Sequence, residues 1–160
     1  MKKVISGLAA ASAAAYLFIL YFMLFSGFGR GMVVMSESML ENFNYWNSVN
    51  LIPFKTIGEY AAAIANGSIQ GHALRNLLGN LLLFFPAGFY MPFFARKARN
   101  IKTYSLLMAA AILMVEITQL LTKSGSLDVD DFILNFAGAL IGFIVFTRTP
   151  ARRLLSFRAW

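Results

Sequence analysis

Polar side chains recur at helical spacing in three otherwise apolar stretches of the chain. Asn76 and Asn80 stand four residues apart, and Glu116 and Gln119 stand three apart. Residues at these spacings share one face of an α-helix. A third set follows the same rhythm in the last apolar stretch: Asp128, Asp131, Asn135 and Gly138. Carboxylates and carboxamides in such a pattern can hydrogen-bond a polar ligand, transfer protons or hold a hard cation.

The stretches that must position these side chains are typical of membrane helices. Of the 160 residues, 59% are hydrophobic and 13% are charged, which is about half the charged share of a soluble domain. Four apolar stretches, at about 7–28, 73–94, 104–121 and 131–147, are long enough or nearly long enough to cross about 30 Å of hydrocarbon as helices. We therefore predict an all-α fold, a polytopic membrane helix bundle of about four transmembrane helices, as a single membrane domain over residues 1–160.

The N-terminal stretch is interpreted as a retained transmembrane helix. Lys2 and Lys3 resemble the basic start of a signal peptide. The apolar run that follows, from Ile5 to Phe28, is longer than the apolar region of a signal peptide and long enough to span a bilayer.

Two shorter segments connect the first two spans. The stretch from Gly29 to Asn50 is too interrupted by polar residues to span, and its pattern favours an amphipathic segment at the membrane interface. Residues 56–66 are predicted to form a short helix, with Thr56 as N-cap, Glu59 at the capping-box spacing and Gly67 just past its end. Such a helix lies on the surface or re-enters the membrane partway.

The charge distribution predicts the orientation. With both termini in the cytoplasm, the inner side holds ten of the fourteen Lys and Arg residues, and all seven acids fall in the outer half. Cytoplasmic loops of membrane proteins collect Lys and Arg. The net charge of +7 is then a topology signal, with membrane lipids rather than nucleic acid as its partner.

In this orientation the polar faces of three helices meet at one depth. At 1.5 Å per residue, Asn80, Glu116 and Asn135 lie about 6–10 Å below the outer surface. A carboxylate inside a membrane helix is costly unless it faces the bundle or a wet cavity. We therefore predict an outward-facing polar pocket, with Lys55 and Arg75 at its rim, lined by Asn76, Asn80, Glu116, Gln119, Asp128, Asp131 and Asn135.

Each of these residues also has a structural interpretation. Glu116 can hydrogen-bond Asn76, Asn80 or Asn135 only to fix helix packing. Asp128 or Asp130 can serve only as the N-cap of the last helix. The acidic cluster could hold Ca²⁺ or Mg²⁺, but it lacks a recognisable ligand spacing, and His72 has no His or Cys near it, so no metal or cofactor is expected.

Catalysis is not indicated by the sequence, although an acid pair could act as a general acid or base. There is no G-x-S-x-G elbow and no phosphate-binding Gly-rich loop, and no His stands beside a Ser. Ser124-Gly125-Ser126 is more typical of a turn than of a nucleophile.

The polar motifs resemble, in order and spacing, those of the VanZ-like family of bacterial membrane proteins. The resemblance covers about residues 50–142 and rests on Asn50-Leu-Ile-Pro-Phe54, Asn76-Leu-Leu-Gly-Asn80 with Phe84, Pro86 and Gly88, Glu116-x-x-Gln119, and Asp128-Val-Asp-Asp131 with Asn135 and Gly138. Many family members carry an Arg between the Gln and the first Asp, where this chain has Gly125. The resemblance implies a bacterial cell-membrane protein and a role in lowering susceptibility to teicoplanin-type glycopeptides.

Three functional hypotheses follow. The first is a membrane protein whose pocket binds a lipid headgroup or a lipid-linked cell-wall component and reduces access of glycopeptides. The second is an enzyme acting on a lipid or cell-wall precursor, with Glu116 and Asp131 as acid–base or metal-binding groups. The third is a structural subunit of an envelope complex. The sequence leaves the oligomeric state open.

Overall fold

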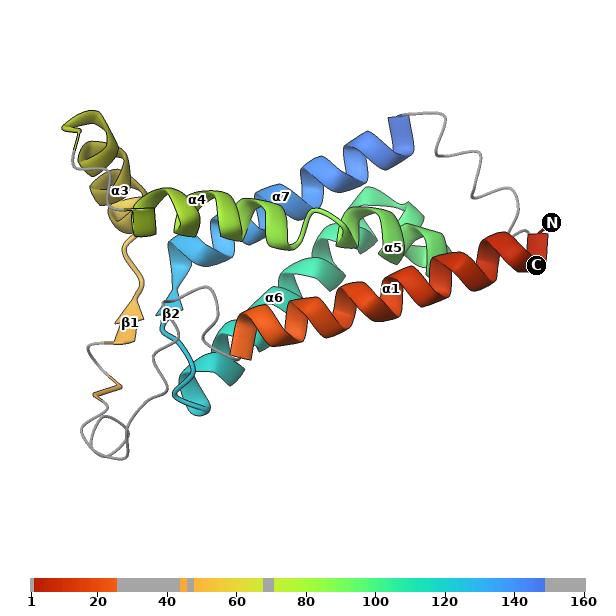
Figure 1. Ribbon diagram of the computed structural model, residues 1–160, viewed down its shortest axis with the longest axis horizontal. Helices are drawn as coiled ribbons and strands as arrows, with labels where there is room; N and C mark the ends of the chain where they lie inside the picture. Colours follow the sequence, from red (N-terminus) through yellow and green to blue (C-terminus); the bar gives the residue numbers. More distant parts are fainter. Residues whose placement is uncertain (1, 26–43, 46–47, 68–70, 149–160) are drawn as a thin grey trace.

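The computed structural model describes residues 2–25, 44–45, 48–67 and 71–148. In this part of the chain nearly all regular structure is helical, which confirms the all-α prediction (Figure 1). The described strands are β1 (Val49–Asn50) and β2 (Leu127–Asp128). The helices are α1 (Lys2–Phe25), α3 (Lys55–Ala65), α4 (Gly71–Leu83), α5 (Ala87–Phe94), the short 3₁₀ helix η3 (Arg96–Arg99), α6 (Ile101–Leu121) and α7 (Val129–Arg148).

Four helical stretches of the described chain are long and apolar enough to cross a membrane. They are Lys3–Phe25, Leu74–Phe94, Ile101–Leu121 and Val129–Arg148, in agreement with the four predicted spans of a multi-pass membrane protein. Helix α6 begins at Ile101 rather than near 104 because the Asn100 side chain caps it, accepting from the amides of Lys102 (2.9 Å) and Thr103 (3.4 Å). Residues 26–28 of the first predicted span, and most of the predicted interfacial segment 29–50, lie outside the described residues.

The second span is broken at Pro86 into α4 and α5, whereas the sequence predicted one segment over 73–94. Proline lacks the amide hydrogen and its ring clashes with the preceding turn. The amide of Ala87 turns to the carbonyl of Phe84 (3.0 Å), and the carbonyl of Leu83 instead accepts the hydroxyl of Tyr16 from α1 (3.0 Å). The break thus supplies an attachment point for α1.

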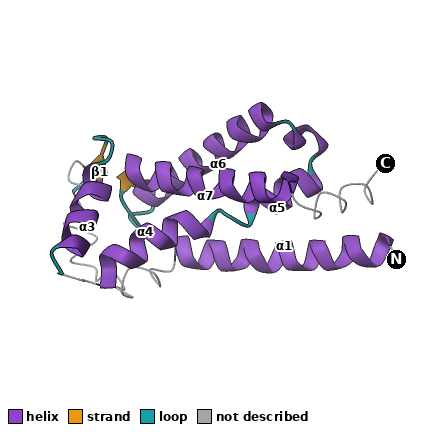
Figure 2. Cartoon of the chain, turned by 90° about the horizontal axis from the view of Figure 1, so that it is seen from above, coloured by secondary structure: helices purple, strands orange, loops and turns teal. Residues whose placement is uncertain are grey.

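Helix α7 is the most buried of the four spans and contacts α4, α5 and α6 (Figure 2). Glycines allow the close approach of α7 to the broken span. A Cβ at Gly138 would overlap the carbonyl oxygen of Leu81, one at Gly142 would overlap that of Phe85, and one at Gly88 would overlap the α7 backbone. Small residues at such contacts are typical of helix packing in membranes.

Helices α6 and α7 share the main apolar core. The hydroxyl of Tyr104 donates to the carbonyl of Ala139 (2.9 Å), and the rings of Tyr104 and Phe143 stack with centroids 4.4 Å apart. Met108 and Ile112 continue the buried face of α6. These contacts fix the level of α6 relative to α7, which matters for the polar residues further along both helices.

Helix α3 lies across one end of the bundle, beside the strands (Figure 1). There β1 pairs in parallel with β2, joining Val49 to Leu127 and Asn50 to Asp128. The predicted end of the helix is confirmed, since Gly67 adopts φ +69° after the last turn. The predicted N-cap is wrong: α3 begins at Lys55, its N-cap residue is Phe54 at φ 65°, and Phe54 offers no side-chain cap. The cap comes from another helix.

Candidate functional site

Asp128 joins the start of α7 to the segment that leads into α3. Its Oδ1 accepts from the amide of Asp130 (2.8 Å), as an N-cap does. The same carboxylate accepts the hydroxyl of Thr56 (2.7 Å) and the side-chain amide of Asn50 (3.1 Å). From the sequence, Asp128 could either line the pocket or cap the last helix. These contacts are those of a helix cap.

Asp130 provides the cap that α3 lacks. Its side chain is fully buried, and its two carboxylate oxygens accept from the amides of Phe54 (2.6 Å) and Ile57 (3.0 Å). A carboxylate is favoured there because the first amides of a helix have no partner within the helix and carry the positive end of its dipole. The sequence offered Asp130 as a cap of its own helix, whereas it caps α3.

Replacing Asp130 with Ala should therefore release α3 from the bundle. Two charge-assisted hydrogen bonds are lost, at about 1.5–3 kcal/mol each, so the amide of Ile57 should exchange with deuterium at least tenfold faster. Hydrogen–deuterium exchange of the purified protein would measure this. Glu59→Ala removes an exposed acid from the same helix and should leave exchange unchanged; equal protection in both variants would contradict the cap.

Asp131 lies next to these two acids but faces the bundle. It is 7% exposed, and its Oδ1 accepts from the side-chain amides of Asn80, in a short hydrogen bond, and of Asn76 at 3.5 Å. The structure thus brings together three of the predicted site residues from α4 and α7. The two hydrogen bonds to one carboxylate join α4 to α7 at this point.

Tyr60 of α3 lies close enough to Asp131 and Asn76 to interact with both, and the sequence analysis missed it. Burial, followed by the Asp131 carboxylate, raises the pKa of the Tyr60 phenol above its usual value, while the side chain of Asn76 opposes the shift. A phenol is protonated at neutral pH even without this shift, so the hydroxyl can donate a hydrogen bond. The available signal was the spacing of Ile57, Tyr60 and Ile64, which gives α3 a single half-buried face.

Glu116 lies on the buried face of α6 and is 3% exposed. From Tyr104 to Glu116 is about 18 Å along the helix axis. Tyr104 contacts Ala139 and Phe143 of α7, and α7 runs antiparallel to α6. Asp131 precedes those two residues by 8 and 12 positions, so it lies about 12–18 Å from them along α7, in the same direction as Glu116 lies from Tyr104. Glu116 and Asp131 are therefore at similar levels on neighbouring helices.

Asn135 lies one helical turn beyond Asp131 on α7 and is 2% exposed. Its side-chain oxygen is buried and has no hydrogen-bond partner among the residues that the structure describes. Such an acceptor is costly to bury unless a donor reaches it. Gln119, by contrast, turns away, since its side-chain amide donates to the carbonyl of Leu24 at the end of α1 (2.9 Å).

We define the buried acceptor cluster as Asp131, Glu116 and Asn135, with Asn76, Asn80 and Tyr60 around it. The sequence motifs that build this cluster also match a known family: the chain matches VanZ/LLP1 over residues 13–152. The protein belongs to the VanZ/LLP1 family. No curated protein and no solved structure matches the chain.

In this VanZ/LLP1 protein the two predicted rim cations lie outside the cluster. Lys55 is exposed at the start of α3, and Arg75 is exposed on α4, with its Nε donating to the carbonyl of Gly71 (2.7 Å). Within the described chain neither forms an ion pair with the acids, and those residues contain no grouping of acids and His that could hold a metal ion. Lys55 stands on α3 and Arg75 on α4, two of the elements that contribute residues to the cluster.

Proposed function

We propose that this VanZ/LLP1 protein binds the polar headgroup of a lipid, or of a lipid-linked cell-wall component, at the buried acceptor cluster. The observation that supports this most is that two buried carboxylates, and a carboxamide oxygen without a partner among the described residues, lie at similar levels near one end of a bundle of membrane-spanning helices. Intramembrane carboxylates are costly and mark functional sites in many membrane proteins.

The chemistry of the cluster favours a ligand rich in hydrogen-bond donors. The carboxylates of Asp131 and Glu116 and the oxygen of Asn135 all accept hydrogen bonds. Sugar hydroxyls, amides and ammonium groups would complement them, whereas a phosphate placed among them would be repelled. A phosphate of the same ligand would instead lie at the surface, near Lys55 and Arg75.

The charge distribution supports a position of this cluster in the outer leaflet of a bacterial cell membrane. Basic residues of the described chain gather at the opposite end, in η3 and at the end of α7, and the cytoplasmic side of membrane proteins is the basic one. There a bound cell-wall intermediate would be shielded from teicoplanin-type glycopeptides, and susceptibility to them would fall.

Glu116→Gln tests this proposal because it removes the charge and keeps the shape. We expect a deletion strain complemented with the variant to remain as susceptible to teicoplanin as the uncomplemented strain, whereas the wild-type protein restores tolerance. Both proteins must be present at equal levels in the membrane. Glu59→Gln, the same change at an exposed position of α3, should behave as wild type. Full tolerance with Glu116→Gln would overturn the proposed site.

A second candidate is an enzyme that acts on the same class of ligand. Its support is that Asp131 and Glu116 lie at similar levels but in different settings, with Asp131 held by two amides. Such a difference separates an acid from a base in many active sites. Deletion would then change the cellular profile of membrane lipids or cell-wall intermediates, and Asp131→Asn would reproduce that change. An unaltered profile would leave binding as the function.

A further inference from the structure

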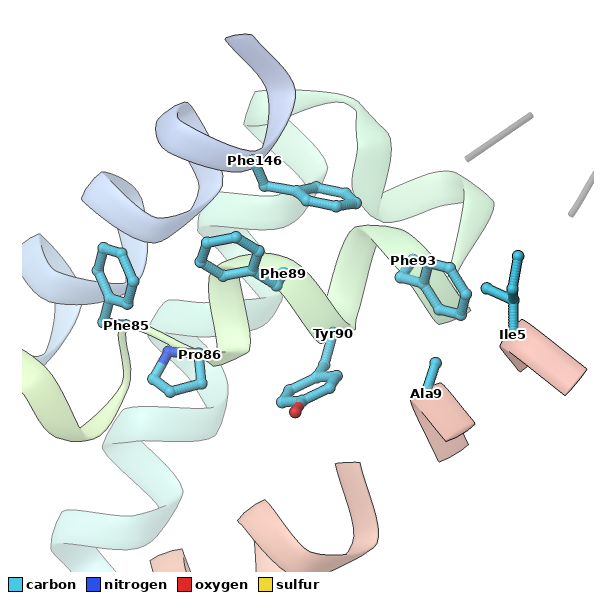
Figure 3. Close-up of a pocket in the computed structure, with 8 residues that line it drawn as sticks. All are labelled: Ile5, Ala9, Phe85, Pro86, Phe89, Tyr90, Phe93 and Phe146. Carbon is cyan, nitrogen blue, oxygen red and sulfur yellow. The ribbon is translucent and has the colours of Figure 1, made fainter. Parts of the chain in front are cut away.

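A cavity of about 310 Å³, with none of the buried acceptor cluster in its lining, extends from the break at Pro86 towards the N-terminal part of α1 and the C-terminal part of α7 (Figure 3). Residues of α1, α5, α7 and the Pro86 break line it: Ile5, Ala9, Phe85, Pro86, Phe89, Tyr90, Phe93 and Phe146. Tyr90 contributes the one polar side chain to this lining, and its ring stacks on Tyr16 with centroids 5.4 Å apart. The wall is otherwise made of carbon.

The cavity has the size and surface for hydrocarbon. An engineered apolar cavity of about 150 Å³ takes up a benzene molecule, so this cavity has room for a stretch of acyl chain. It is formed where the break at Pro86 separates α4 from α5 and where α1 passes beside α5. In a membrane-spanning bundle this position faces the acyl chains of the surrounding lipid.

On three elements, exposed basic residues lie within a few positions in sequence of residues that line the cavity. Lys3 is exposed two residues before Ile5 on α1, and Arg148 is exposed two residues after Phe146 on α7. Exposed Lys97 lies in η3, shortly after Phe93. Because none of the acids of the described chain lies on α1, α5 or η3, this end of the bundle complements an anionic headgroup. Basic pockets between membrane helices bind anionic lipids in this way.

We infer that this cavity binds one acyl chain of an anionic phospholipid from the leaflet at the basic end, with Lys3 and Arg148 holding its phosphate. This site is separate from the buried acceptor cluster and does not depend on the proposed function. The lipid would fill the gap left by the broken span and fasten α1 to α5 and α7.

Native mass spectrometry of the full-length protein, released from vesicles of phosphatidylglycerol and phosphatidylcholine, tests the inference. The protein is extracted from the vesicles in mild detergent, which is then removed in the mass spectrometer. We expect one phosphatidylglycerol to remain bound to each chain, with phosphatidylcholine retained at least tenfold less. The double variant Lys3→Gln, Arg148→Gln should bind phosphatidylglycerol about thirtyfold more weakly, at about 1 kcal/mol for each charge. Lys102→Gln removes an exposed charge from α6, which does not line the cavity, and should not change retention.

A second pair of variants tests the cavity itself. Ala9→Leu places extra carbon in the cavity and should reduce lipid retention at least tenfold, whereas Ala10→Leu adds the same side chain on the exposed side of α1 and should not. Melting curves in detergent would confirm that both variants fold. Retention of phosphatidylglycerol by Ala9→Leu, or equal retention of the two lipids by wild type, would overturn the inference.

Discussion

Replacement of Gly138 by alanine is expected to separate α7 from α4 and to destabilise the bundle more than any other single methyl addition. The new Cβ would overlap the backbone carbonyl of Leu81, and a backbone cannot move aside as a flexible side chain can. Overpacking of this kind costs about 1–3 kcal/mol and sometimes more, and we expect the upper end of that range. Thermal unfolding in mild detergent, followed by circular dichroism, would show the lowered midpoint.

Gly79→Ala is the matched control for this experiment. Gly79 lies on α4, the helix that α7 approaches at Gly138. A Cβ at Gly79 would meet nothing within 4 Å. Alanine favours a helix over glycine by about 1 kcal/mol, so this variant should be as stable as the wild type or slightly more stable. Equal midpoints for Gly138→Ala and Gly79→Ala would show that the close approach of α4 and α7 does not limit stability.

The second large effect is expected from exchanging the two partners of the short hydrogen bond between α4 and α7. Asn80→Asp alone would place two carboxylates in contact inside the bundle, and an uncompensated buried charge costs about 3–5 kcal/mol. The single variant should therefore fail to accumulate. The double variant Asn80→Asp, Asp131→Asn restores one carboxylate and one amide, and the protein should return to the membrane at near wild-type levels.

The double variant also separates stability from function. Its carboxylate stands on α4 instead of α7, so the acceptor that the proposed ligand meets has moved. We expect a folded protein that does not restore tolerance to teicoplanin, measured at matched membrane levels. Full tolerance in the double variant would show that the pair only joins the helices. A double variant as poorly expressed as Asn80→Asp would show that the two residues are not energetically coupled.

The number and approximate bounds of the membrane spans were determined by the sequence alone. Hydrocarbon imposes a minimum length of about 20 apolar residues on a spanning helix, and this requirement is local, so it can be recognised in a single stretch of chain. The spacing of Asn76 with Asn80 and of Asp131 with Asn135 is local in the same sense. Helical periodicity alone placed each pair on one face.

The partners of the acidic side chains were decided only by the tertiary structure. Asp130 has the sequence context of an N-cap, yet its carboxylate caps α3, more than seventy residues earlier in the chain. Thr56 has the context of an N-cap too, and its hydroxyl instead donates to Asp128. Periodicity shows which face a residue occupies, but not which helix that face meets.

The break at Pro86 shows the same division in one place. The missing amide hydrogen of proline weakens a helix, yet one unbroken segment was predicted here, and Pro92 lies within α5 without ending it. What fills the interruption depends on neighbours that are distant in sequence: the hydroxyl of Tyr16 at the carbonyl of Leu83, and Gly142 beneath the carbonyl of Phe85. Local chemistry thus determined the spans and their polar faces. Which faces meet was decided by close packing of distant segments, because burying each unpaired polar group requires one particular partner.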